Sequence, residues 1–235
     1  MEFRHAAALR AAFPDLSVGV IRARGPFLDA SASPVVTTLV ERARARLAAG
    51  GEGEFPEIVA WRRAFSRMGL KPTQYRSASE SLLRRLRQEG SLPAIHPAID
   101  LANAVSVGFA VPIAVFDLER VEGGLEVRHA TGDEVYSTFA GDEEHPEPGE
   151  VIFADAAGRA HARRWCNRQS GLSAIRPSTR EVLIVAEAMH EGGAETVARL
   201  VETLAEALAA HGATVLSTAR PTAAASIVRF TPPNG

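Results

Sequence analysis

Cysteine, lysine and long apolar runs are scarce in this chain of 235 residues. The single cysteine, Cys166, excludes an internal disulfide and cannot supply a zinc site built from several thiolates. One cysteine is also typical of a reducing compartment. No uninterrupted apolar run approaches the roughly 18 residues of a membrane-spanning helix. Because Glu2, Arg4 and His5 stand where a signal peptide would lead into its apolar segment, we expect a cytoplasmic protein with no membrane partner.

The common signatures of metal and nucleotide chemistry are also missing. The sequence has no GxxxxGK[ST] phosphate loop, no GxGxxG dinucleotide loop, no GxSxG nucleophile elbow and no HExxH zinc motif. The seven histidines are scattered, and no two of them have the i, i+4 spacing of a helical metal pair. We therefore expect no metal and no cofactor.

Positive charge is carried almost entirely by arginine and is unevenly distributed. Lys71 is the one lysine among 26 basic residues, while the formal net charge is only -2. Residues 62–87 hold eight basic residues and one acid, and residues 159–180 hold six arginines and no acid. Residues 117–155, between them, hold twelve acids. If the fold joins the two basic stretches, they form a surface for an anionic ligand, with the acidic segment pointing elsewhere; otherwise each is a solvated face.

Hydrophobic periodicity predicts helices and strands that are segregated along the chain. We expect a strand at 16–24, four helices beginning near Pro34, Pro56, Ser77 and Pro97, and about six strands between 111 and 189. A long helix at 194–211 and a strand at 214–220 follow. Strands grouped apart from helices favour an α+β fold over a doubly wound sheet.

Turn residues and the lack of a linker refine this organisation. The glycine pair at 123–124 predicts a hairpin between strands at 111–118 and 125–130. No segment is long and polar enough to divide the chain. We expect residues 1–55 to be a strand and helix extension packed on a domain at 56–220, with a C-terminal tail at 221–235 that is loose at its last residues, TPPNG.

Three stretches carry more polar side chains than packing requires. In the first, at 69–80, a helix cap explains Ser77 and Glu80 but neither Arg76 nor Ser79. In the second, at 92–106, three polar residues recur every three positions along an otherwise apolar helix: Asp100, Asn103 and Ser106. Such a polar edge is either an internal hydrogen-bond network or the wall of a pocket.

The third polar stretch is RWCNR at 164–168. Trp165 between arginines is either a plug at a strand end or a stacking platform beside phosphate-binding guanidinium groups. Cys166 could be a nucleophile, although a lone buried cysteine is more often a packing residue.

Together these stretches resemble the B3/B4 domain of bacterial phenylalanyl-tRNA synthetase β subunits, in its free-standing form. The similarity rests on an ordered set of segments at compatible spacing between about Trp61 and Arg180. The segments are GLKP at 69–72, RSASESL at 76–82, LPAIHPAIDLANAVS at 92–106, the strand at 111–117, GEVIFAD at 149–155 and WCNR at 165–168.

The resemblance implies a three-layer β/β/α domain with an N-terminal helical extension, and an editing role. In the synthetase this domain hydrolyses wrongly attached amino acid, notably tyrosine, from tRNA without a metal. Water attacks the ester carbonyl and the terminal ribose hydroxyl leaves, which requires a side-chain pocket, oriented water and donors for the oxyanion. We predict Asn103 and Ser106 as catalytic residues of the pocket wall. Residues predicted to bind substrate or the CCA end of tRNA are Arg76, Ser79, Glu80, His96, Trp165 and Arg168.

Two departures from the family pattern leave other functions open. His96 stands where the family usually has asparagine, and residues 132–136 are only loosely like its glutamate-bearing strand. The amino acid recognised can therefore differ from tyrosine. One alternative is a non-catalytic tRNA- or RNA-binding module of the same fold. Another is a small-molecule amino-acid binder or hydrolase, with a deep polar pocket and no arginine rim. The sequence does not fix the oligomeric state.

Overall fold

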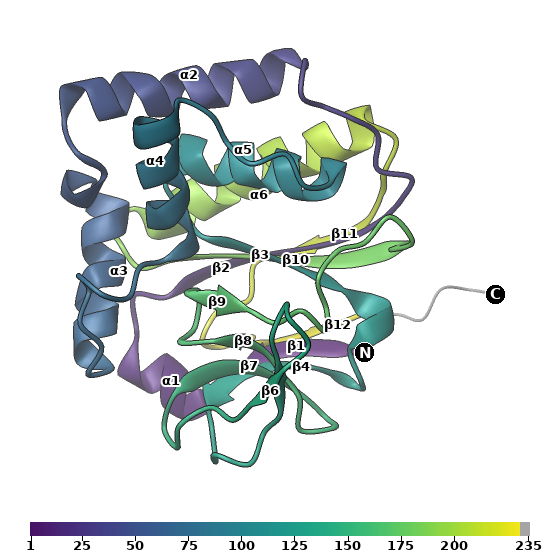
Figure 1. Ribbon diagram of the computed structural model, residues 1–235. Coiled ribbons are helices and arrows are strands. Elements are labelled where there is room, and N and C mark those ends of the chain that lie inside the picture. The colour runs from purple at the N-terminus through teal and green to yellow at the C-terminus, as the bar shows by residue number, and fades with distance from the viewer. Residues whose placement is uncertain (231–235) are drawn as a thin grey trace.

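Two β-sheets and a layer of helices are stacked in the structure, a computed structural model that describes residues 1–230 (Figure 1). The middle layer is an antiparallel four-stranded sheet of order β11-β2-β10-β3. Its strands are β2 (Ser17–Arg24), β3 (Ile113–Asp117), β10 (Glu181–Ala188) and β11 (Thr214–Ala219). The predicted α+β class and its β/β/α layering are confirmed.

The second sheet has six strands in the order β12-β1-β4-β7-β8-β9. In this sheet β1 and β4 are parallel, and the other neighbours are antiparallel. Its strands are β1 (Glu2–His5), β4 (Gly124–His129), β7 (Val151–Asp155), β8 (Ala160–Arg163), β9 (Arg168–Gln169) and β12 (Ile227–Arg229). A two-stranded hairpin, β5 (Tyr136–Ser137) and β6 (Glu143–Glu144), projects between β4 and β7.

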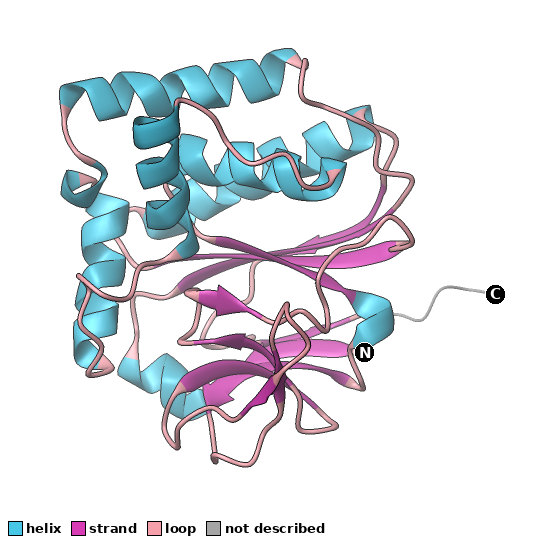
Figure 2. Ribbon diagram, in the orientation of Figure 1, coloured by secondary structure: helices cyan, strands magenta, loops and turns pink. Residues whose placement is uncertain are grey.

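Helices cover the outer face of the four-stranded sheet (Figure 2). Helix α6 (Gly193–Ala210) packs on β2, β10 and β11, and α5 (Pro97–Phe109) lies between α6 and α2 (Pro34–Ala49). The remaining helical elements are α1 (Ala7–Ala12), η1 (Glu52–Glu54), α3 (Pro56–Arg67), α4 (Ala78–Glu89) and η2 (Leu118–Arg120). Within residues 1–230, no helix combines the length and apolar character needed to cross a membrane.

Strand β10 explains why the chain forms three layers. Its apolar residues run without interruption, and alternate side chains point to opposite faces. Val182 and Ile184 join the core beneath the helices, while Leu183 and Val185 join the core between the two sheets. A strand that is apolar on both faces is stable only when both faces are covered.

The predicted hairpin at 111–130 is wrong. Strand β3 pairs with β10 in the four-stranded sheet, whereas β4 pairs with β1 and β7 in the other. Both strands bury apolar side chains in the core between the sheets, among them Phe116 of β3 and Leu125 of β4. The two strands therefore face each other across that core, with η2 and the turn at Gly123 (φ +70°) carrying the chain between them.

Several short elements at the chain ends have no counterpart in the predictions. Strand β1 and helix α1 precede the first predicted strand. Strand β12 lies inside the region predicted as tail and pairs with β1. The TPPNG segment lies outside the described residues.

The loop that carries the β5–β6 hairpin is held by a buried carboxylate, Glu134, which is 2% exposed. Its oxygens accept hydrogen bonds from the backbone N–H of Thr131 (3.1 Å) and Gly132 (3.0 Å) and from the Arg128 guanidinium. Burial opposes ionisation, but these donors outweigh it and lower the pKa of Glu134 from 4.5 to about 2.

Replacing Glu134 with glutamine is expected to lower the free energy of unfolding at pH 7 by about 1–3 kcal/mol. Since the folded-state pKa lies below the unfolded one, the ionised carboxylate stabilises the fold above pH 4.5. That contribution is lost as the pH falls from 4.5 toward 2. Urea unfolding at several pH values measures it. Glu143→Gln, an exposed change in the same hairpin, is the control. Identical acid dependence of wild type and Glu134→Gln would contradict this assignment.

Candidate functional site

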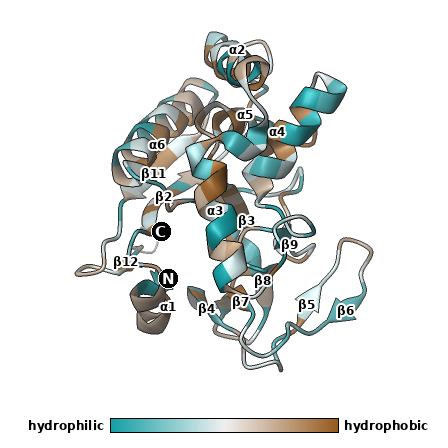
Figure 3. Cartoon of the chain, turned by 90° about the vertical axis from the view of Figure 1, so that its left-hand side faces the viewer, coloured by the Kyte–Doolittle hydropathy of each residue, from teal (hydrophilic) through white to brown (hydrophobic). Residues whose placement is uncertain are grey.

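The β9 end of the six-stranded sheet lies beside β3 of the four-stranded sheet (Figure 3). A small pocket lies between the two sheets at this end. It has a volume of about 60 Å³ and is lined by residues from six separate parts of the chain. One wall comes from the start of β3 and the end of β10, and the other from β7, β8 and the loop that leads into β9. The lining residues are Ala78, Pro112, Ile113, Ala114, Phe153, Ala162, Trp165, Cys166, Asn167, Arg168, Gln169, Val185 and Glu187.

Two of the polar stretches singled out in the sequence meet at this pocket. The side-chain Nδ2 of Asn167 donates to the backbone oxygen of Arg76 (2.8 Å), across 91 positions of sequence. The backbone N–H of Ala78 donates to the oxygen of Cys166 (2.9 Å). The 165–168 segment is thereby fixed against the start of α4, where Ser77 caps the helix by accepting from the Glu80 N–H (3.3 Å).

The loop from β8 to β9, which lines the pocket, contains a tight turn made by two non-glycine residues. Arg164 and Trp165 both adopt left-handed backbone conformations, with φ of 47° and 60°. Such a conformation costs about 1–3 kcal/mol per residue and is found disproportionately at functional sites. Two bonds offset it here: the Trp165 N–H donates to the Val151 oxygen (2.7 Å) and the Arg164 N–H to Glu150 Oε1 (3.0 Å).

A buried carboxylate, Glu187, forms part of the pocket wall and is 3% exposed. Its Oε1 accepts from His5 Nε2 (2.6 Å) and from Trp165 Nε1 (3.0 Å). Within residues 1–230 no donor reaches its Oε2. Glu187 was not predicted from the sequence. The signal that points to it is an acid within the apolar strand EVLIVAEA, because a buried charge requires partners.

Carboxylates neutralise most of the positive charge of the arginines at the rim of the pocket. Arg168 donates two hydrogen bonds to Glu144 (2.8 and 3.1 Å), and Arg163 pairs with both Glu144 (2.7 Å) and Glu150 (2.9 Å). The expectation that the acidic segment points away from the basic stretches is therefore wrong. The Arg163 side chain is only 6% exposed, and a buried guanidinium requires carboxylate partners.

The other basic stretch is compensated in the same way. Glu80, which is 1% exposed, lies 2.6 Å from Arg62 and 3.6 Å from Arg76. Arg164 instead lies over the Tyr75 ring, 4.8 Å from its centroid. The rim therefore retains guanidinium groups but carries less net positive charge than the sequence counts suggest.

The structure places the predicted substrate-binding residues in three different settings. Trp165 and Arg168 line the pocket. Ser79 and Glu80 are buried beside it at the start of α4, where Ser79 Oγ lies 3.2 Å from Ser77 Oγ. His96 caps α5 by accepting from the Ala98 N–H (3.2 Å), and burial lowers the pKa of this imidazole. It does not line the pocket.

Neither predicted catalytic residue lines the pocket. Ser106 is 1% exposed, and its hydroxyl donates to the Val111 oxygen (2.7 Å), which fixes the turn before Pro112. Asn103 is half-buried in α5, and its amide has no hydrogen-bond partner in the described part of the chain. Asp100 caps the preceding loop by accepting from the Ile95 N–H (2.8 Å).

Trp165 acts as a packing residue and not as a stacking platform. It is completely buried, and its ring meets Phe13 and Trp61 edge to face, with centroids 5.0 and 5.2 Å away. An indole held this way, with its N–H on Glu187, presents no face to a base.

Cys166 lines the pocket but is not an activated nucleophile. Burial raises the pKa of this thiol well above 9.0, and the nearby Glu187 carboxylate raises it further. Because the thiolate is the reactive form, a thiol in this environment is inert near neutral pH.

We expect iodoacetamide to alkylate Cys166 at pH 8 at less than about a tenth of the rate found in the urea-unfolded protein. Mass spectrometry of quenched time points measures both rates. Equal rates for folded and unfolded protein would show that the thiol ionises as readily as a solvated cysteine, contrary to its raised pKa.

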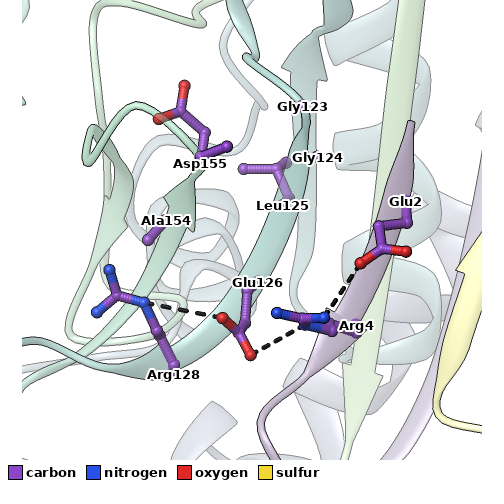
Figure 4. Close-up of a pocket in the computed structure, with 10 residues that line it drawn as sticks. Glu2, Arg4, Gly123, Gly124, Leu125, Glu126, Arg128, Ala154 and Asp155 are labelled. Carbon is purple, nitrogen blue, oxygen red and sulfur yellow. Dashed lines mark hydrogen bonds and ion pairs between the residues drawn. The ribbon is translucent and has the colours of Figure 1, made fainter.

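A larger hollow of about 260 Å³ lies on the outer face of the six-stranded sheet (Figure 4). Its charged side chains pair with one another: Arg4 with Glu2 (3.1 Å) and Glu126 (3.0 Å), and Arg128 with Glu126 (3.9 Å). These pairs leave no uncompensated group to attract a ligand, so the pocket between the sheets is the better candidate. Within residues 1–230, no group of three or more metal-ligating side chains is placed to hold a metal ion.

Comparison with known proteins settles the family. The family model of the B3/4 domain matches residues 60–208, more than half of the chain. The chain belongs to the B3/4 domain family. This result confirms the resemblance found in the sequence.

Relatives of this B3/4 protein include phenylalanine–tRNA ligase beta subunits. That of Shewanella oneidensis is 33% identical over 101 residues, covering 43% of this chain and 12% of the relative. That of Coxiella burnetii is 43% identical over 53 residues, covering 23% and 7%. The chain thus spans about a tenth of the length of these relatives.

A solved N-terminal fragment of the phenylalanyl-tRNA synthetase beta subunit from Pyrococcus horikoshii is also similar. It aligns with a TM-score of 0.42 and 15% identity over 51% of this chain and 41% of the fragment. At this TM-score the likeness carries no weight for function.

Proposed function

We propose that this B3/4 protein is an aminoacyl-tRNA deacylase that hydrolyses the ester of a mischarged tRNA in the pocket between the two sheets. The observation that supports the proposal is the Asn167–Arg76 hydrogen bond, which joins two arginine-bearing segments at the mouth of a small pocket. The curated relatives act on tRNA as ligases by name, and tRNA is accordingly the partner proposed here.

The pocket supplies groups suited to orienting a water molecule. The amides of Asn167 and Gln169 each donate to a backbone oxygen, that of Arg76 (2.8 Å) and that of Val115 (2.6 Å). These bonds fix the amide groups and leave their oxygens available to accept from water. A water held there attacks the ester carbonyl, and the terminal ribose hydroxyl leaves.

Ser106 acts on the pocket indirectly in this scheme. Its bond to the Val111 oxygen fixes the turn that leads into Pro112, and through it the first wall of the pocket. It is therefore a positioning residue. Arg168, at the rim, is partly exposed and serves to contact the tRNA backbone.

A non-catalytic tRNA-binding module is the second candidate. The position of Asn103 and Ser106 outside the pocket lining favours it, because neither can contact a bound ester there. Such a module would bind tRNA in a salt-dependent way without turnover. An amino-acid binder unrelated to tRNA fits less well, because arginine side chains border the pocket.

A panel of mischarged tRNAs tests the proposal. Purified protein at catalytic concentration is expected to accelerate ester loss at least about tenfold for one or more members of the panel. Acceleration of none, together with salt-dependent binding of the same tRNAs, would overturn the deacylase and support the binding module.

A further inference from the structure

The size of the pocket limits the side chain that can enter it. An interior cavity of about 150 Å³ is what benzene occupies in an engineered protein. The pocket volume here, about 60 Å³, is less than half of that. A tyrosine or phenylalanine side chain, which contains a benzene-sized ring, does not fit between Ala114, Ala162 and Phe153 without displacing them.

The pocket wall contains a hydrogen-bond acceptor, the Glu187 carboxylate. Glu187 is only 3% exposed. The two side chains that donate to it, His5 and Trp165, both bind Oε1. Its Oε2 therefore keeps its acceptor capacity within a pocket whose other nearby side chains are mostly apolar, including Val185 and Phe153. Because Oε2 is not among the enclosed side-chain atoms that lack a partner within residues 1–230, it stays accessible to water or to a ligand hydroxyl that donates to it.

We infer that the pocket selects a short side chain carrying a hydroxyl, so that the substrate class is a seryl or threonyl ester. The inference rests on the proposed function and narrows it. The substrate hydroxyl donates to Glu187 Oε2, in place of water. An alanyl or valyl group of similar size fits the pocket but leaves the carboxylate oxygen without a donor.

The preference for seryl over alanyl esters, and for threonyl over valyl esters, follows from the hydrogen bond that the smaller or apolar group cannot make. Sites built to bind a substrate hydroxyl reject the analogue that lacks it by factors of about 10⁴ or more. Because water can still reach this partly open pocket, we expect a smaller preference, at least about 100-fold in kcat/KM for seryl over alanyl.

The test offers wild-type protein five substrates: seryl-, threonyl-, alanyl-, valyl- and tyrosyl-tRNA. Seryl or threonyl ester loss is expected to be fastest, with alanyl and valyl at least about 100-fold slower. If another ester, such as the tyrosyl one, is hydrolysed fastest, the deacylase proposal stands and this inference falls. If none is hydrolysed, the deacylase proposal falls.

Binding of stable analogues decides the substrate class even without hydrolysis. Seryl and alanyl groups joined by an amide to 3′-amino-adenosine are titrated by calorimetry. Affinity at least about tenfold tighter for the seryl analogue supports the hydroxyl-reading pocket, since one hydrogen bond to a charged group is worth that much. Equal affinities overturn it.

A variant of the carboxylate tests the assignment directly. Glu187→Gln keeps the size and an acceptor oxygen but removes the charge, and is expected to lower the seryl-to-alanyl ratio at least about tenfold. Glu181→Gln, on the same strand but paired with Arg24 (3.0 Å) outside the pocket, is expected to leave the ratio unchanged. An unchanged ratio in a folded Glu187→Gln protein overturns the inference. If that variant does not fold, the wild-type ratio decides.

Discussion

Replacing Ala114 with phenylalanine is expected to lower kcat/KM for ester hydrolysis at least about 100-fold, with a smaller loss of stability. Ala114 is half-buried at the start of β3, lines the pocket and pairs with Val185 of β10. A benzyl group at this position is larger than the 60 Å³ pocket, so it fills the pocket and pushes against its walls. Because displacements of about 1 Å can cost about 100-fold in rate, we expect kcat/KM to fall at least that far.

Single-turnover deacylation and thermal unfolding together measure this effect. Ala219→Phe is the matched control: Ala219 is also half-buried, but it lies in β11 at the opposite edge of the same sheet and outside the pocket lining. Both variants should still unfold cooperatively, with a loss of about 1–3 kcal/mol in the free energy of unfolding. Full activity in Ala114→Phe would show that the ester is hydrolysed elsewhere.

Replacing Trp165 with alanine is expected to cost about 3–5 kcal/mol of unfolding free energy. The indole is fully buried, contacts Phe13 and Trp61 edge to face, and donates to Glu187. Its removal leaves a large cavity and takes one of two donors from a buried carboxylate. Trp165→Phe keeps a ring but loses the N–H, and a smaller cost of about 1–3 kcal/mol is expected.

Equilibrium unfolding in guanidinium chloride measures these differences. Phe139→Ala provides the control, because Phe139 is 75% exposed and its loss should change stability by less than about 0.5 kcal/mol. A Trp165→Ala protein as stable as Phe139→Ala would contradict the packing role and reopen base stacking as its function.

Local signals account for the elements that the sequence predicted well. Ser77 caps the helix that it was expected to cap, and Pro34 and Pro56 stand at the first positions of theirs. Strand β10 lies in the region where hydrophobic periodicity predicted about six strands. Each of these signals acts on residues close to it in sequence, so its effect does not depend on how the distant parts of the chain pack.

Features that depend on distant contacts were not predictable in the same way. A glycine turn after β3 looks like a hairpin, and only the pairing partners β10 and β1 reveal that the chain changes sheet. The 92–106 segment was recognised as a helix with a polar edge, but which side of it meets the pocket depends on how α5 packs against α2 and α6. Asn103, predicted on a pocket wall, does not line the pocket between the sheets.

One segment of the candidate pocket stands out in the sequence by its composition. Trp165 and Arg168 stand out within 164–168 and do line the pocket. Glu187 does not stand out, because a single acid in a buried strand has meaning only once its donors His5 and Trp165, from remote segments, are known. The neutralisation of Arg168 by Glu144 likewise joins residues whose contact no local pattern indicates.

The most direct test is a crystal structure of the protein with an amide-linked aminoacyl-adenosine analogue. The aminoacyl group is predicted to lie between Ala114 and Ala162, within hydrogen-bond distance of Glu187, with the adenosine extending past Arg168. An analogue bound instead on the outer face of the six-stranded sheet, beside Arg4 and Glu126, would contradict the assignment of the pocket as the aminoacyl site.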